Sequence, residues 1–246
     1  MIKTWAVTDT GLVRKENQDT YRIARNGDIC VVCDGMGGAA GGRLASTLAS
    51  ETYAAEMEKA LKPDMTPEQF REASAYAVAM ANRAVAERAE AEAALANMGT
   101  TLVAAVAYEN GAVITNVGDS RAYYITEAGI TRITKDHSLV ETMVDHGDIT
   151  ADEARRHPGR NLITRALGPG YQRCLRRVYP PYGAGGLYPA VHRRTDRQVQ
   201  RHAAASGTER RPAAAGAGAV AHGAGARGRA GRHITLVLIE ITALDA

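Results

Sequence analysis

Apolar and polar residues alternate in several parts of the chain, and this alternation predicts β-strands. The strand-like stretches are residues 4–11, 19–34, 100–134 and 233–242. The second stretch turns at Asn26-Gly27. The third is expected to be an antiparallel meander, with a hairpin turn at Asn110-Gly111 and another at 127–129. The last stretch, HITLVLIEIT, predicts one buried strand near the end of the chain.

Helical periodicity lies between these strand-like stretches. Apolar residues recur every four positions from about Arg43 to Leu61, where Lys62-Pro63 ends the pattern. A second helix is expected from a capping box that begins at Thr66, and its alanine-rich body runs to about Ala96. Residues 138–157 predict a helix-turn-helix with another capping box. Strands, two helices, strands and helices again predict sheets that are covered by helices.

Composition narrows the class of protein. The chain has 246 residues and is long enough to bury a sizeable core. No stretch approaches the ~20 apolar residues of a membrane span, and the first residues show no secretory pattern, so we expect a cytoplasmic protein without a membrane partner. Three cysteines do not make a disulfide scaffold. Cys30 and Cys33 form a C-x-x-C, but residues three apart in a strand face opposite sides, which favours two buried thiols over a zinc or redox motif.

Residues 171–232 differ from the rest of the chain. They hold twelve arginines, no lysine and two acidic residues, a net charge of +10, and they lack Ile, Phe and Met. This composition predicts a disordered segment without packed strands or helices. Two explanations are open: a native arginine-rich insert, or, as we prefer, translation in a shifted reading frame. The segment has little aromatic interleaving and no nucleic-acid-binding motif, so we expect no nucleic-acid partner.

Three aspartates stand at or beside the ends of strand-like stretches: Asp19, Asp34, which precedes Gly35, and Asp119. Clustered carboxylates repel each other unless a cation bridges them, and oxygen ligands suit Mg²⁺ or Mn²⁺. Arg14 lies five residues before Asp19 and could hold a phosphate group in bidentate fashion. Residues 35–40 also match the dinucleotide fingerprint G-x-G-x-x-A, but a helix follows where that fingerprint needs a second strand.

Six motifs together resemble the ordered series of bacterial type 2C protein phosphatases, the metal-dependent Ser/Thr phosphatases. They are GLVRKENQD, VVCDGMGG, MGTTLVAA, NVGDSRAYY, TKDHSLVETMVDHGDITADEARRHP and NLITRALG. The resemblance covers residues 1–170, and ITLVLIEI looks like that family's last strand. None of the three cysteines has an arginine six positions later, which argues against a cysteine-based phosphatase.

The resemblance implies an α+β fold: a four-layer α-β-β-α sandwich of two antiparallel sheets flanked by helices. It implies two Mn²⁺ or Mg²⁺ ions, with a third ion held weakly, and hydrolysis of phosphoserine or phosphothreonine in proteins by an activated water. By the same resemblance Asp34 bridges the metals, Gly35 offers its carbonyl, and Asp19 belongs to the cluster. Arg14 contacts the phosphate, and Asp119 helps to hold the third ion. Its partners would be phosphorylated proteins, the substrates of a Ser/Thr kinase.

Further positions are interpreted through the same resemblance. Residues 144–160 look like the flap that shapes substrate access. Met36 stands where animal relatives have a histidine proposed as general acid, so a solvent proton donor is expected. His137, His146 and His157 are expected on the surface or in the flap rather than at a metal. We expect a monomeric, single phosphatase-like domain over 1–246, with 171–232 as the atypical segment and 233–246 as the final strand.

The C-terminal part departs from the family's pattern. The family has two further carboxylates there, one in a Ser/Thr-Asp-Gly at a strand end and one in an Asp-Asn before the last strand. Here Arg197 follows Asp196, and Arg232-His233 precedes the last strand. The loss of two carboxylates would weaken the binding of a hard cation. The alternative prediction is therefore an impaired relative that binds phosphoproteins without turnover, and the C-terminal part of the fold is expected to be disrupted.

Overall fold

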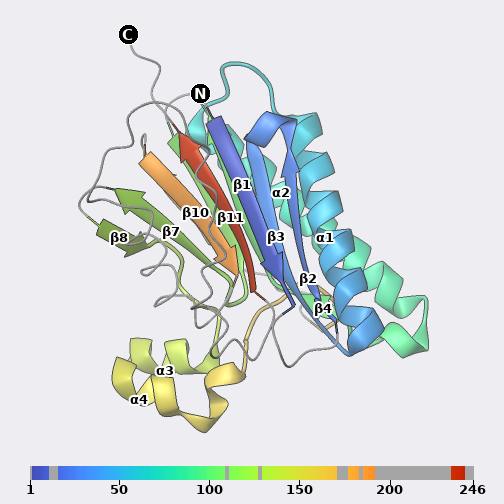
Figure 1. The fold of residues 1–246 in the computed structure, drawn as a ribbon. Coiled ribbons are helices and arrows are strands. Elements are labelled where there is room, and N and C mark those ends of the chain that lie inside the picture. Colours follow the sequence, from blue (N-terminus) through green and yellow to red (C-terminus); the bar gives the residue numbers. More distant parts are fainter. Residues whose placement is uncertain are drawn as a thin grey trace.

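Two antiparallel β-sheets pack face to face in the computed structural model of the chain (Figure 1). The structure describes residues 2–10, 16–108, 111–126, 129–170, 177–182, 185–191 and 234–241. Sheet A has the strand order β1 (Ile2–Asp9), β11 (Ile234–Ile241), β10 (Gly185–Val191), β7 (Arg121–Thr126), β8 (Gly129–Arg132). Sheet B has the order β2 (Asp19–Ala24), β3 (Ile29–Met36), β5 (Leu102–Tyr108), β6 (Gly111–Val117), β9 (Arg177–Tyr182), with β4 (Gly99–Thr100) beside β3. The predicted antiparallel sandwich is confirmed.

Sheet B is buried on both faces, and strand β3 shows this most clearly. Ile29, Val31 and Cys33 belong to the core that sheet B shares with two helices. Cys30 and Val32 belong to the second core, which fills the space between the two sheets. The two cysteines therefore face opposite sides, as predicted. A strand buried on both faces is apolar at successive positions rather than at alternate ones, which explains the run ICVVC.

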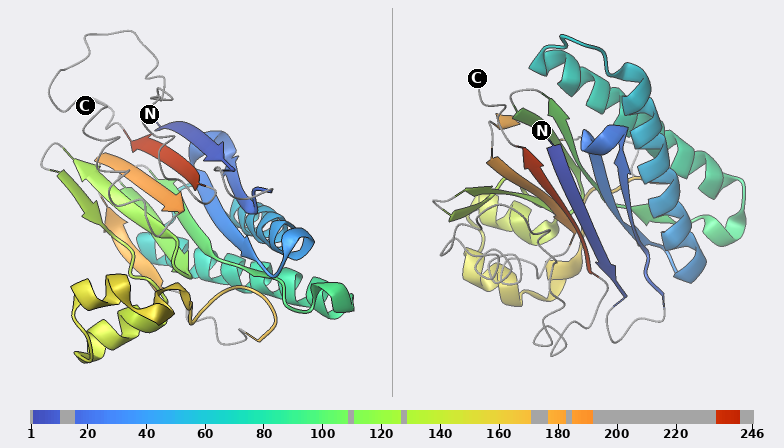
Figure 2. Two further views of the ribbon diagram at one scale, coloured as in Figure 1. Left: turned by 60° about the horizontal axis from the view of Figure 1, so that its bottom comes forward. Right: turned by 45° about the horizontal axis from the view of Figure 1, so that its top comes forward.

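Helices α1 (Ala39–Ala60) and α2 (Pro67–Glu90) lie over the outer face of sheet B (Figures 1 and 2). Helix α2 begins at the predicted capping box, in which the Thr66 side chain accepts from the Gln69 amide. Helix α1 begins four residues before the predicted start, because Gly37 and Gly38 turn the chain with φ of +107° and +90°. Helix α2 ends at Glu90, earlier than predicted, and the short helix η2 (Ala93–Leu95) follows. No helix in the described ranges is both long and apolar enough to cross a membrane.

A small helical unit lies beyond the lower end of the sheets in Figure 1 and consists of α3 (Leu139–His146), α4 (Ala151–Arg156) and η3 (Pro158–Asn161). Both α-helices begin as predicted: Ser138 caps α3, and Thr150 caps α4 with a full capping box. Gly147 ends α3 in the left-handed region with φ +80°. In the described part of the chain, the outer helical layer is α1 and α2 on sheet B.

The predicted meander over 100–134 is divided between the two sheets. Its first hairpin, β5–β6, belongs to sheet B, and its second, β7–β8, belongs to sheet A. The chain changes sheets at Gly118, whose φ of +102° is open to glycine but strained for other residues. The prediction of one continuous meander is therefore wrong, although both predicted hairpins form.

Two strands lie inside the segment 171–232, for which no packed strand was predicted. Strand β9 pairs with β6, and β10 lies between β7 and β11. That prediction is wrong for 177–182 and 185–191, because ladder hydrogen bonds come from the backbone and can form without an apolar pattern in the added strand. The remainder of the segment, with Asp196, lies outside the described residues. The predicted last strand is confirmed: β11 pairs with β1 from Ile2↔Ile241 to Asp9↔Ile234.

Candidate functional site

Two of the predicted aspartates stand directly opposite each other at the lower end of sheet B. Asp19 opens β2, and its register partner on β3 is Asp34. Asp34 follows Cys30 and Val32 on the inner face, so the pair points toward sheet A. Asp19 is 6% exposed and Asp34 is half-buried. Like charges directly opposite in an antiparallel pair repel each other, so this arrangement needs a compensating positive charge.

The position after Asp34 is a glycine, Gly35, and the structure leaves no room for a side chain at this position. A Cβ on Gly35 would lie 1.9 Å from the carbonyl oxygen of Gly42 in the first turns of α1. The Gly35 amide donates to the Gln18 carbonyl at 3.1 Å, which ties β3 to the residue before Asp19. The missing side chain of Gly35 thus allows a close backbone approach, and the approaching group is helix α1.

The backbone of Asp34 is held by two threonines. Its amide donates to Thr101 Oγ1 at 3.0 Å, and its carbonyl accepts from Thr100 Oγ1 and from the Thr101 amide, each at 3.0 Å. Thr101 Oγ1 also lies 2.5 Å from Ser120 Oγ, and the two hydroxyls share a hydrogen bond. Ser120 follows Asp119, which is 7% exposed, so these bonds link Asp34 to the loop that carries the third predicted aspartate. Within the described residues, however, no three His, Cys, Asp or Glu side chains form a cluster that could hold a metal ion.

His137 holds the Asp119 loop, a position that the sequence did not indicate. Its Nδ1 accepts from the Gly118 amide at 3.1 Å, and its own amide donates to the Gly118 carbonyl at 2.9 Å. His137 is 4% exposed, so the expectation of a surface or flap position is wrong for this histidine. The tertiary fold buries it because residues 135–137 return to the end of β6, a contact that no local pattern encodes. His146, by contrast, is exposed at the end of α3.

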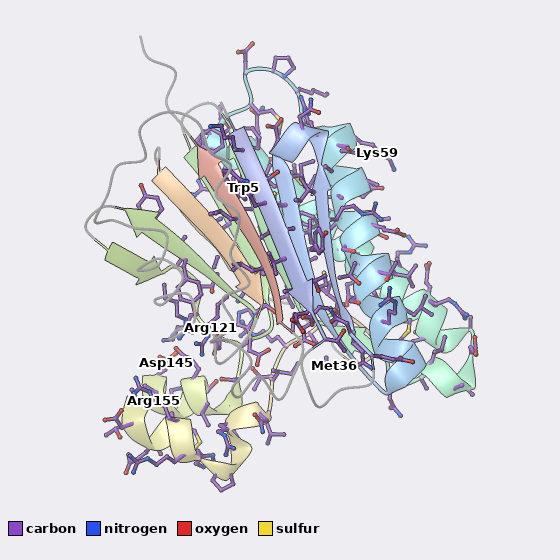
Figure 3. All side chains as sticks on the ribbon, in the orientation of Figure 1. Trp5, Met36, Lys59, Arg121, Asp145 and Arg155 are labelled. Atoms are coloured by element: carbon purple, nitrogen blue, oxygen red, sulfur yellow. The ribbon has the colours of Figure 1, made fainter. Side chains whose placement is uncertain are left out.

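Ion pairs join the helical unit to sheet A, since Arg132 Nη2 of β8 lies 3.8 Å from Glu141 Oε2 of α3. The Asp136 carboxylate accepts from Arg121 Nε at 3.0 Å and Nη2 at 2.7 Å, and from Arg132 Nη2 at 2.9 Å. Figure 3 shows Arg121 between the strands and the helices α3 and α4. Lys135 also pairs with Asp145 of α3. The predicted flap, 144–160, lies at the end of the molecule where β2 begins and β3 ends, which is the end that carries Asp19 and Asp34 (Figures 1 and 2).

Strand β3 also carries Cys30, Cys33 and Met36, and their chemistry shows whether they could act as nucleophiles or proton donors. Burial, aided by the Asp28 carboxylate, raises the pKa of Cys30 to about 12. Burial, aided by the carboxylates of Asp19 and Asp34, raises the pKa of Cys33 further. Neither thiol is poised as a nucleophile. Met36 lies at the same lower end (Figure 3), and it offers no proton there.

The donor atoms at this end fit a hard divalent cation. Asp19 and Asp34 offer carboxylate oxygens, and Gly35 is fitted so closely beneath α1 that its backbone is fixed. Carboxylate and carbonyl oxygens are the ligands that Mg²⁺ and Mn²⁺ prefer. Arg14, the predicted phosphate ligand, and His233, at the place of a missing carboxylate, lie outside the described residues.

Comparison with known proteins identifies the family of the chain. The family model described as Protein phosphatase 2C matches residues 13–159, more than half of the chain. The serine/threonine phosphatase stp of Listeria monocytogenes is 37% identical over 164 residues, which are 65% of this chain and 65% of that protein. The chain thus covers just under two thirds of this relative's length. The chain belongs to the protein phosphatase 2C family.

Solved structures show the same fold over nearly the whole chain. The serine/threonine phosphatase Stp1 of Staphylococcus aureus superposes with a TM-score of 0.81 at 28% identity, covering 98% of this chain and 96% of that one. The catalytic domain of the phosphatase PstP, solved with two manganese ions, has a TM-score of 0.75 at 26% identity and 98% coverage of both chains. The α+β architecture read from the sequence is confirmed by these neighbours.

Proposed function

We propose that this protein is a metal-dependent Ser/Thr protein phosphatase that hydrolyses phosphoserine and phosphothreonine in other proteins. The observation that carries the proposal is the direct opposition of Asp19 and Asp34 beside Gly35 at the lower end of the sheets. Family membership and the name of the Listeria relative support the reaction class. Neither the described structure nor the comparisons favour the alternative, a relative that binds phosphoproteins without turnover.

Asp34, Asp19 and the Gly35 carbonyl would hold two Mn²⁺ or Mg²⁺ ions, and Asp119 would help to hold a third. Such ions supply Lewis acidity and activate water near neutral pH. The chain itself contributes negative charge at fixed positions, because Thr100 and Thr101 lock the backbone of Asp34. Arg14 would bind the substrate phosphate, since a guanidinium matches phosphate in bidentate fashion.

The proton for the leaving group comes from solvent in this proposal. Met36 follows the Asp34-Gly35 pair and has no titratable group. The buried thiols of Cys30 and Cys33 keep their protons at neutral pH. The reaction therefore proceeds without a side-chain acid from β3. We further propose that the protein acts as a monomer in the cytoplasm on substrates of a Ser/Thr kinase.

The experiment is phosphate release from a phosphothreonine peptide, with Mn²⁺ at increasing concentration. Asp34→Asn and Asp19→Asn should each lower kcat/KM by at least about a hundredfold, because a neutral amide replaces an anionic ligand. Asp64→Asn is the matched control. Asp64 is exposed, lies between α1 and α2 at the other end of the sandwich, and has φ +60°, which asparagine tolerates.

The outcomes separate the candidates. Mn²⁺-dependent release that Asp34→Asn abolishes and Asp64→Asn leaves unchanged supports the proposal. If the chain binds the phosphopeptide but releases no phosphate at any Mn²⁺ concentration, the proposal fails and the binding alternative stands. Release in EDTA would refute the metal requirement.

A further inference from the structure

Asp19 accepts a hydrogen bond from the opposite sheet. Thr235 Oγ1, the second residue of β11, donates to Asp19 Oδ2 at 2.9 Å, and the bond is buried. The two residues are 216 positions apart in the sequence. Thr235 is fully buried, so its hydroxyl has little access to solvent. The last strand of sheet A therefore contacts a candidate metal ligand on sheet B.

The bond is one part of a closed ring. Thr8 Oγ1 lies 2.8 Å from Thr235 Oγ1, its register partner on β1. Asn17 Nδ2 donates to Thr8 Oγ1 at 2.7 Å, and Asn17 Oδ1 accepts from the Asp19 amide at 3.0 Å. The ring thus runs from the Asp19 amide through three side chains to the Asp19 carboxylate.

With Asp19 as an ionised carboxylate, the groups at the two ends of the ring set the direction of both hydroxyl protons. The amide nitrogen of Asn17 can only donate, and an ionised carboxylate can only accept. Thr8 must therefore donate to Thr235, and Thr235 must donate to Asp19. A flipped Asn17 amide would turn its nitrogen toward the Asp19 amide and lose that bond. Its oxygen would then face Thr8, whose hydroxyl would donate to Asn17 instead of to Thr235. The ring consequently has a single arrangement that keeps all of its hydrogen bonds.

We propose that Thr235, Thr8 and Asn17 are positioning residues that fix the Asp19 carboxylate for cation binding. A carboxylate is planar, so holding Oδ2 and the backbone amide sets the direction of the other oxygen as well. The ring also ties β1 and β11 of sheet A to β2 of sheet B at the end where the site lies (Figure 1). Hydrogen bonds of this kind orient the ligands of metal sites. The inference rests on the proposed function, because it assigns Asp19 to a cation.

The first measurement is Mn²⁺ affinity by titration calorimetry on metal-free protein. Thr235→Val keeps the β-branched shape and removes the hydroxyl, and it should raise the dissociation constant tenfold or more. Thr235→Ser restores the donor and should stay within about twofold of the unaltered chain. Thr8→Val should also raise the Mn²⁺ dissociation constant, but by less than Thr235→Val does. The matched control is Thr4→Val on β1, because no hydrogen bond involves the hydroxyl of Thr4 in the described structure and its register partner is Ile239.

The second measurement needs no metal. Urea unfolding in EDTA of Thr235→Val, Asp19→Ala and the double variant gives the coupling between the two side chains. A charged hydrogen bond predicts a coupling of about tenfold in the unfolding equilibrium constant. Should Thr235→Val fail to fold, Thr8→Val, at an exposed position, carries both measurements.

The results of these measurements bear separately on the positioning role, on the ring and on the proposed function. Unchanged Mn²⁺ affinity in Thr235→Val, or no rescue by Thr235→Ser, overturns the positioning role while leaving the proposed function in place. Absence of coupling in EDTA overturns the ring itself. If the unaltered chain binds no Mn²⁺, the proposed function fails first, and the role of the ring at a cation site fails with it.

Discussion

Replacing Gly35 by alanine tests how the site is built. The added Cβ would lie 1.9 Å from the Gly42 carbonyl oxygen, 2.3 Å from the Gly42 carbonyl carbon and 2.8 Å from the Gln18 carbonyl oxygen. All three are backbone atoms, so no side-chain rotation relieves the contact. Strand β3 and helix α1 must separate by about 1.1 Å before the shortest distance reaches 3.0 Å.

This separation sets the size of the effect. Overpacking costs typically about 1–3 kcal/mol, and we expect the upper end, about 3 kcal/mol in the free energy of unfolding, because rigid backbone lies on both sides. The Gly35 carbonyl would move with its strand. Metal ligands tolerate only a few tenths of an ångström, so Mn²⁺ affinity should fall by more than tenfold as well.

Gly38→Ala is the matched control, because nothing lies within 4 Å of a Cβ there. Its φ of +90° leaves only backbone strain, which costs about 1–2 kcal/mol. Urea unfolding and Mn²⁺ calorimetry on both variants give the comparison. If Gly35→Ala is no less stable than Gly38→Ala, or binds Mn²⁺ like the unaltered chain, the steric reasoning is wrong.

Three further predictions concern buried polar groups. Burial raises the pKa of Tyr53 from its ordinary value near 10 to about 12, so stability from this group is complete below pH 10 and is lost as the pH rises through 12. Tyr53→Phe should lower the free energy of unfolding by about 1 kcal/mol at pH 7, because the hydrogen bond between the Tyr53 hydroxyl and Ser74 is lost. The same variant should show a smaller fall in stability above pH 10. Cys30 and Cys33 should resist iodoacetamide at pH 8 until urea unfolds the chain, as peptide mass spectrometry would show. His137→Ala should cost about 1–3 kcal/mol in urea unfolding by leaving the Gly118 amide unsatisfied.

Each of these three predictions has a control variant or an outcome that would contradict it. Tyr76→Phe, at a side chain that is 58% exposed, should change neither stability nor its pH dependence. Labelling of either strand cysteine in the folded protein would contradict its assigned burial. His137→Asn, whose Oδ1 can replace Nδ1 as acceptor, should be more stable than His137→Gln, and the reverse order would argue against the Gly118 contact.

Much of the local structure could be predicted from short-range chemistry. The capping boxes at Thr66 and Thr150 start helices where the sequence placed them, because the partners are three residues apart. The hairpins β5–β6 and β7–β8 form for the same local reason. The opposition of Asp19 and Asp34 was also within reach, since a turn at Asn26-Gly27 sets the register of β2 on β3.

Other features depend on contacts between distant segments. The sheet change at Gly118, the strands β9 and β10, and the burial of His137 follow from how the two sheets stack. No periodicity in the segment after Gly170 indicates β9 or β10, because their partners supply the ladder.

From the sequence we predicted most helices and strands of residues 1–170, the last strand, and three aspartates at or beside strand ends. We also predicted a resemblance that the comparisons confirmed as membership of the protein phosphatase 2C family. Which distant groups support those carboxylates follows from the packing of the two sheets. Thr235 reaches Asp19 because β11 pairs with β1 at full register and sheet A packs against sheet B. Hydrogen bonds depend on the separation of atoms in space, and 216 residues of intervening chain carry no local signal for this one.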